Sequence, residues 1–174
     1  RLSTGDLALL RELGYATIRV AVLEPGDIHE DTAARRVAAT IMRAGVMATE
    51  AVHSRVNLLA EFSGVAEIEN DALLQLNDID GVTIATVQGH TLVRPRQRIA
   101  TIKIIPFALP ETTLAAAEEL GRRAGGVVGV RPLRLATVGV ILVVSQAARE
   151  RVSRGVFPAI AGRVTDLGST VGQV

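Results

Sequence analysis

One apolar segment limits the folds open to this chain more than any other. Residues 137–144 (TVGVILVV) form an almost unbroken hydrophobic run. Such a run is typical of a strand buried on both faces, as in the parallel sheet of an α/β fold, and it is too short to span a bilayer. The pattern that follows predicts a helix over 147–167, with a kink or a break at Pro158, and a new strand beginning at 170–174.

The part of the chain before this run has a different pattern, with many short strands separated by turn residues. We therefore expect an α+β region with a small β-rich module over residues 1–133, followed over 134–174 by the beginning of a three-layer α/β/α domain. Because 134–174 supplies one β-α unit and not a sheet, we expect the sequence to be part of a longer chain. Strands are predicted at residues 17–23, 58–69 (two, divided at Gly64), 82–87, 92–93, 99–105 and 127–133, and helices at 7–13, 27–44, 71–77 and 110–124.

Specific residues are predicted to fix the helix ends. Asp27 and Glu30 have the spacing of a capping box at the start of the helix over 27–44. Asn70 is expected to cap the helix over 71–77, since its side chain can accept from a free backbone N–H. Pro110 is suited to the first position of the helix over 110–124.

Composition excludes several classes of function. Aromatic residues are 2% of the chain, which argues against single-stranded nucleic-acid binding by base stacking, and the net charge is only +1. The absence of cysteine excludes disulfides, thiolate metal sites and a cysteine nucleophile. The first residues carry no apolar signal region. We expect a cytoplasmic protein that binds neither nucleic acid nor membrane, and we interpret short basic clusters at 94–98, 122–123 and 149–154 as solvated faces, with anion binding as the alternative.

The most polar turn of the first half lies at residues 26–31, where Asp27 and Glu30 are candidate binding residues. A helix N-terminus favours negative charge, which alone explains the acidic residues there, and a ligand or an interface is the alternative. His29 lies between them, but a metal site would need a further ligand. His53 and His90 cannot be placed nearby from the sequence, so we predict no metal.

Three more candidates lie on predicted strands or beside them. Arg55 and Asn57 occupy alternate positions and therefore the same face of an extended segment, where they would hold a loop or bind an anion. Lys103 lies in the middle of an apolar strand. Such a lysine usually faces solvent from a sheet edge, and a phosphate or carboxylate partner is the alternative.

The loop after the apolar run provides the remaining candidates, Ser145, Gln146 and Arg149. In open α/β sheets, ligands bind beyond the carboxyl ends of the strands, and a helix N-terminus there offers free amides to a phosphate. Ser145 would cap the helix and Arg149 would pair with the anion. The chain has no glycine-rich phosphate motif.

Taken together and in this order, segments 26–34 (GDIHEDTAA), 54–60 (SRVNLLA) and 100–107 (ATIKIIPF), with Gly64 and Asn77, resemble the N-terminal region of bacterial molybdopterin-binding proteins. This family is related to the molybdopterin molybdotransferases. The resemblance implies a modular N-terminal region before a three-layer α/β/α domain that binds the pterin. It also implies a homodimer and molybdopterin as cofactor. Family members often have Thr-Gly and an acidic residue after the first strand of that domain, whereas residues 144–146 here are Val-Ser-Gln.

Three functional hypotheses remain open, and no self-contained catalytic constellation is visible. The first is binding or handling of molybdopterin, in which the loop over 144–149 contacts the pterin phosphate. The second is a non-catalytic scaffold or dimerisation module without a ligand. In the third, residues 92–105 form half of a biotinyl- or lipoyl-carrier barrel. A carrier needs a modifiable lysine at a hairpin tip, and the only lysine, Lys103, lies inside a predicted strand.

Overall fold

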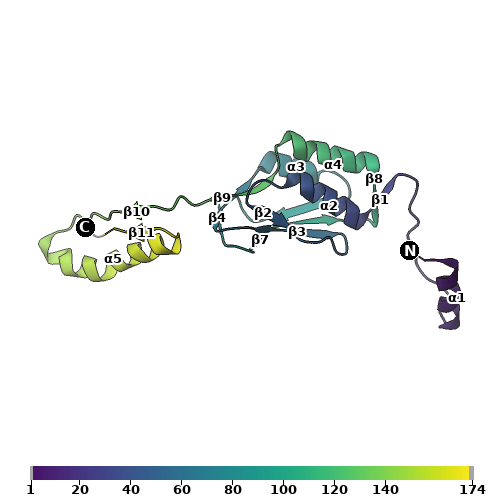
Figure 1. Cartoon of the computed structure of the whole chain (residues 1–174), viewed down its shortest axis with the longest axis horizontal. Helices are drawn as coiled ribbons and strands as arrows, with labels where there is room; N and C mark the ends of the chain where they lie inside the picture. The colour runs from purple at the N-terminus through teal and green to yellow at the C-terminus, as the bar shows by residue number, and fades with distance from the viewer. Residues whose placement is uncertain (1, 173–174) are drawn as a thin grey trace.

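The computed structural model describes residues 2–172, and their fold is mixed α+β. A central domain, defined here as residues 27–132, carries the whole hydrophobic core. Helix α1 (Thr4–Glu12) precedes this domain and a small C-terminal unit follows it (Figure 1). Within residues 2–172, no helix combines the length and the apolar character that a membrane crossing requires.

A four-stranded antiparallel sheet forms the base of the central domain. Its strand order is β2-β3-β7-β5, so β3 and β7 are the central strands. Helices α2, α3 and α4 gather on one side of the strands (Figure 1). Burial alternates along the strands, as a half-covered sheet requires: Val56 and Leu58 of β3 are buried, whereas Arg55 is exposed. The bounds are β2 (Val46–Ala48), β3 (Arg55–Ala60), β5 (Val82–Thr86), β7 (Arg98–Ile104), α2 (Glu30–Ile41), α3 (Asn70–Asn77) and α4 (Glu111–Arg123).

Two smaller sheets complete this domain. In the first, β4 (Gly64–Ile68) pairs with β6 (Leu92–Val93) and with β9 (Val128–Pro132). In the second, β1 (Asp27–His29) pairs with β8 (Ala108–Pro110). The predicted helix over 27–44 therefore starts later than expected, because its first residues are taken by the β1–β8 ladder.

Helices α2 and α4 lie close together and are joined by an ion-pair cluster. A Cβ at Gly121 of α4 would lie 2.8 Å from Oγ1 of Thr40 on α2, so the crossing requires glycine. Arg36 of α2 donates to both carboxylate oxygens of Glu111 and of Glu118, at 2.7 to 2.9 Å. These hydrogen bonds lower the pKa of both glutamates and raise the pKa of Arg36.

The C-terminal unit is a parallel strand-helix-strand, as the sequence predicts. β10 (Thr137–Val138) pairs in parallel with β11 (Thr170–Val171), and η1 (Gln146–Ala148) and α5 (Arg149–Asp166) connect them. α5 runs through Pro158 as a single helix, so the predicted break does not occur. The last part of the predicted strand over 170–174 lies outside the described residues.

Two sequence-predicted strands differ from the structure for one physical reason. Residues 17–23 form no strand, and Val22 is 83% exposed. Of the apolar run over 137–144, only β10 is paired, and Val143 is 93% exposed. Both segments have the β-branched composition of strands. A strand also needs a hydrogen-bonded neighbour, and among residues 2–172 only Thr137–Val138 of these two segments has one.

Helix caps are the other point of difference. Asn70 is the first residue of α3 and not its cap, and the residue before it, Glu69, makes no side-chain cap hydrogen bond. Pro110 precedes α4 directly, one position before the predicted one. In contrast, Ser3 and Asp6 form a capping box on α1 that was not predicted.

Candidate functional site

The predicted site residues lie in three places, of which the first is the junction of β1 and α2. Oδ2 of Asp27 accepts a hydrogen bond from the backbone N–H of Glu24 at 2.9 Å and so closes a turn. The backbone N–H of Glu30 donates to the carbonyl of Phe107 at 3.0 Å. The predicted capping box of Asp27 and Glu30 is therefore wrong: the N-cap of α2 is His29, whose Nδ1 accepts from the N–H of Asp31 at 3.3 Å.

Asp31, which the sequence analysis does not single out, links this junction to the β2–β3 hairpin. Its Oδ1 accepts a hydrogen bond of 2.8 Å from the backbone N–H of Ser54. Ser54 is 5% exposed, and it and His53 both have positive φ, 65° and 49°. Two consecutive positive φ values, with mutual hydrogen bonds between Val52 and Arg55, indicate a type I′ turn. This turn costs conformational energy at residues other than glycine, and Asp31 helps to hold it.

The same junction gathers the segments that carry the family resemblance. Ser54, at the start of segment 54–60, contacts Asp31 of segment 26–34 through its N–H. Its carbonyl accepts from the N–H of Ile104 in segment 100–107 at 2.9 Å. The hydrogen bond from the N–H of Glu30 to the carbonyl of Phe107 joins segments 26–34 and 100–107 a second time. Three segments that are distant in sequence therefore meet at one end of the four-stranded sheet.

The second place is the outer face of that sheet, on the side away from the helices; we call it the open face. Arg55 on β3 lies opposite Lys103 on β7, and Asn57 lies opposite Thr101. The prediction that Arg55 and Asn57 share a face is confirmed by the alternating burial along β3. Lys103 does face solvent, but from the central strand β7 and not from an edge. It is not at a hairpin tip, where a carrier lysine would lie.

Arg98 joins these residues on the open face. The sequence analysis places it in the basic cluster at 94–98, as part of a solvated face or an anion site, but does not predict its position near Arg55. The register of β3 against β7 shifts between Leu58 and Leu59, so that Leu59 lies opposite Arg98. This bulge turns both Ile99 and Ala100 inward and leaves Arg98 exposed. Within residues 2–172, no carboxylate lies within 4.0 Å of Arg55, Arg98 or Lys103.

The third place is the loop before α5, which holds Ser145, Gln146 and Arg149. Ser145 precedes η1, and its carbonyl accepts from the N–H of Ala148 at 3.0 Å, but its side chain makes no cap hydrogen bond. Gln146 begins η1 and Arg149 begins α5. All three side chains are exposed. The loop follows the extended segment 139–144, which places it at the carboxyl end of that segment, as predicted.

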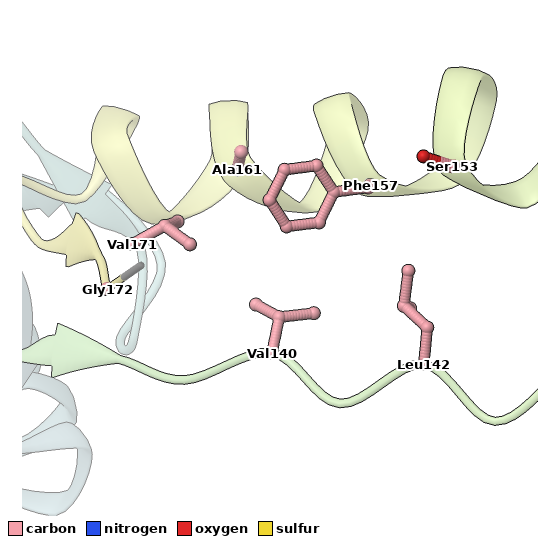
Figure 2. A pocket seen from close by; sticks show the side chains of 7 residues that line it. All are labelled: Val140, Leu142, Ser153, Phe157, Ala161, Val171 and Gly172. Carbon is pink, nitrogen blue, oxygen red and sulfur yellow. The ribbon is translucent and has the colours of Figure 1, made fainter. Parts of the chain in front are cut away.

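A largely apolar hollow of about 630 Å³ lies between this extended segment and α5. Figure 2 shows Val140 and Leu142 pointing from the segment toward the helix, where Phe157 and Ala161 face them. Ser153 supplies the side-chain hydroxyl of the lining. The hollow exists because α5 covers this face of the segment incompletely.

The structure therefore brings some predicted residues together and keeps others apart. Arg55, Asn57 and Lys103 share the open face of the central domain. Ser145, Gln146 and Arg149 share one loop of the C-terminal unit, at the end of α5 that is farther from the central domain (Figure 1). Among the described residues, no group of His, Asp and Glu is arranged to hold a metal ion.

Comparison with known proteins adds no identification to this geometry. No protein-family model matches the chain, and no curated protein or solved structure matches it significantly. The fold is mixed α+β, with a parallel strand-helix-strand unit in the C-terminal part of the described residues.

Proposed function

We propose that this chain takes part in binding or handling molybdopterin, a pterin that carries a phosphate group. The observation that carries the proposal is the convergence of segments 26–34, 54–60 and 100–107 at one end of the sheet, through Asp31, Ser54 and Ile104. These are the segments that resemble molybdopterin-binding proteins. Their mutual hydrogen bonds mean that the three segments form one structural unit of this chain.

The loop before α5 is the part of the chain best suited to the phosphate of such a ligand. Arg149 supplies a guanidinium, which matches a phosphate with paired N–H donors, and Ser145 supplies a free hydroxyl. The start of α5 adds the positive end of the helix dipole, while the N–H groups of Ala148 and Arg149 already donate to the carbonyls of Ser145 and Gln146. The neighbouring hollow, with Leu142 and Phe157, offers apolar walls to the flat faces of a pterin ring. The donor set therefore fits an anionic pterin.

Pterin fluorescence tests this proposal directly. The chain is titrated into a phosphorylated pterin, alongside Arg149→Gln, with Arg163→Gln as the control because Arg163 lies exposed in the last turn of the same helix. We expect a dissociation constant about tenfold higher for Arg149→Gln, since one charge-assisted pair is lost, and no change for Arg163→Gln. Equal affinity of all three proteins, or no binding by any, would contradict the proposal.

A second candidate function, self-association or scaffolding, is favoured by a separate observation. Ile141 and Val143 are 89% and 93% exposed, on the face of segment 139–144 that α5 does not cover. Adjacent exposed apolar side chains of this kind usually mark an interaction surface. Sedimentation velocity would test it: a homodimer that dissociates in Ile141→Lys but not in Leu74→Lys, an exposed apolar position on α3, supports this function. A monomeric chain at all concentrations would exclude self-association through this face.

A further inference from the structure

We propose that the open face of the central domain binds a small dianion of the phosphomonoester class between Arg55 and Arg98. This site is separate from the loop at residues 145–149. It does not rest on the proposed molybdopterin function, because it is argued from the register, space and charge of the four-stranded sheet alone.

The strand register places the cationic side chains around a common area. Arg55 lies opposite Lys103, and Leu59, four residues further along β3, lies opposite Arg98. The two arginines are therefore about 13 Å apart along the strand direction, at a rise of about 3.3 Å per residue. Thr101 lies between them on β7. Two long arginine side chains extending from opposite ends can both reach an anion held above Thr101.

The area between the arginines is hollow. Its volume is about 410 Å³, which falls within the range of small-molecule sites. Ala85 of β5 lies opposite Thr101, and its short side chain leaves the space open. The lining consists of Arg55, Ala85, Thr86, Val87 and residues 98–101. A hollow of this size suits a small organic anion and not a macromolecule.

The open face carries positive charges that a bound dianion would neutralise. Arg55 and Lys103 are directly opposite each other across the strands, and like charges at such a position are destabilising. Among the other described arginines of the central domain, Arg36, Arg122, Arg123 and Arg131 are each paired with a glutamate, whereas Arg35, Arg43, Arg94 and Arg96 are not. The side chains that line the hollow include no carboxylate.

Hydrogen-bond donors complete the site. The hydroxyl of Thr101 lies 2.8 Å from Oδ1 of Asn57, to which it donates. Asn57 lies opposite Thr101 beside the lining of the hollow, and its amide nitrogen makes no hydrogen bond among the described residues, so both of its hydrogens can be donated to another acceptor. A guanidinium binds phosphate through paired N–H donors, and the Lys103 ammonium adds a point charge nearby. A phosphomonoester is bound by cationic side chains and neutral hydrogen-bond donors where no carboxylate competes for them, and the open face provides this combination.

The experiment is an amide-detected NMR titration of the full chain. Phenyl phosphate is the main probe, benzyl alcohol is the uncharged control, and inorganic phosphate and a phosphorylated pterin identify which part of a ligand is recognised. We expect phenyl phosphate to shift the amides of residues 55–57, 85–87 and 98–101, and benzyl alcohol to shift none of them. Tighter binding of the phosphorylated pterin than of inorganic phosphate would identify a pterin as the source of the phosphate group, and equal binding would identify the phosphate alone.

Variants distinguish this site from general attraction to a basic protein. Arg55→Gln combined with Arg98→Gln should raise the dissociation constant at least tenfold, and Lys103→Gln should raise it less. Arg35→Gln removes an exposed arginine from α2, on the helical side of the sheet, and should change nothing. All these side chains are exposed, so the core remains intact. Unchanged affinity in the double variant, shifts spread over the surface, or much tighter binding of an oligonucleotide or an acidic peptide would overturn the proposal.

Discussion

Asp31 and Ser54 lie 23 residues apart in the chain, and the backbone N–H of Ser54 donates a hydrogen bond of 2.8 Å to Oδ1 of Asp31. This bond anchors the type I′ turn to the start of α2. Asp31→Ala would leave the N–H of the buried Ser54 without its partner and should lower the free energy of unfolding by about 1–3 kcal/mol.

Urea denaturation checks this expectation, with two further variants for comparison. Asp31→Asn keeps an oxygen that can accept the hydrogen bond, so its loss of stability should be smaller than that of Asp31→Ala. Asp80→Ala, at an exposed position after α3, should have little effect. An Asp31→Ala protein as stable as the wild type would show that the turn holds without this bond.

Glu118 makes the stability of the α2–α4 pair dependent on pH. Hydrogen bonds from Arg36 hold the pKa of Glu118 below its ordinary value of 4.5. The folded protein therefore binds this proton less tightly than the unfolded chain does. The stability from this carboxylate is present above about pH 4.5 and is lost as the pH falls through the lowered pKa.

We therefore expect Glu118→Gln to unfold at lower urea concentration than the wild type at neutral pH, with the difference shrinking as the pH falls below about 4.5. Denaturation at a series of pH values measures this, with the exposed Glu50→Gln as the control. If the difference in stability between the two proteins stayed constant with pH, the charge of Glu118 would not be what stabilises the contact with Arg36.

Gly121 and Gly155 are both helical glycines, but replacing them with alanine should have opposite effects. Alanine at Gly155 of α5 meets nothing within 4 Å, so it should stabilise that helix by up to about 1 kcal/mol through helix propensity. A Cβ at Gly121 would lie 2.8 Å from Oγ1 of Thr40, and this overlap should cost about 1–3 kcal/mol. Circular dichroism during thermal unfolding would compare the two variants, and a stable Gly121→Ala protein would show that α2 and α4 can move apart freely.

Lys103 should reduce the stability of the sheet that carries it. Lys103→Thr removes the like charge opposite Arg55, so we expect a gain of about 0.2–1 kcal/mol in phosphate-free buffer at low salt. The gain should shrink at high salt, because salt screens exposed charges. Denaturation at two salt concentrations checks both points. A variant less stable than the wild type at low salt would mean that the lysine stem packs on the sheet more favourably than its charge repels Arg55.

The periodicity of hydrophobic residues predicted correctly those helices and strands that pack or pair with a neighbouring element in the fold. The alternation over residues 82–87 and the apolar stripe of α2 at Ala34, Val37 and Ile41 are confirmed. Segments 17–23 and 139–144 failed as strands because pairing depends on residues elsewhere, which a periodic pattern does not contain. The caps at Asp27 and Asn70 failed for a related reason, since tertiary contacts decided where α2 and α3 begin.

On the open face, the site was predictable only where it follows the alternation of a strand. The shared face of Arg55 and Asn57 comes directly from the two-residue period of β3. Arg98 reaches this face through a bulge at Leu58 and Leu59, which carries no signal in the sequence. The role of Asp31 was equally hidden, because its acceptor function depends on a turn 23 residues away.

The exposed extended segment 139–144, which pairs with no described strand, also affects how the protein behaves in concentrated solution. Residues 135–148 contain no charged residue and no proline, and the charges that border them are Arg134 and Arg149. Short β-prone segments without charge or proline are the ones that stack into cross-β aggregates. With Ile141 and Val143 exposed, the two flanking arginines act as the gatekeepers against such stacking. Replacing either arginine would therefore affect colloidal stability even where folding is unchanged.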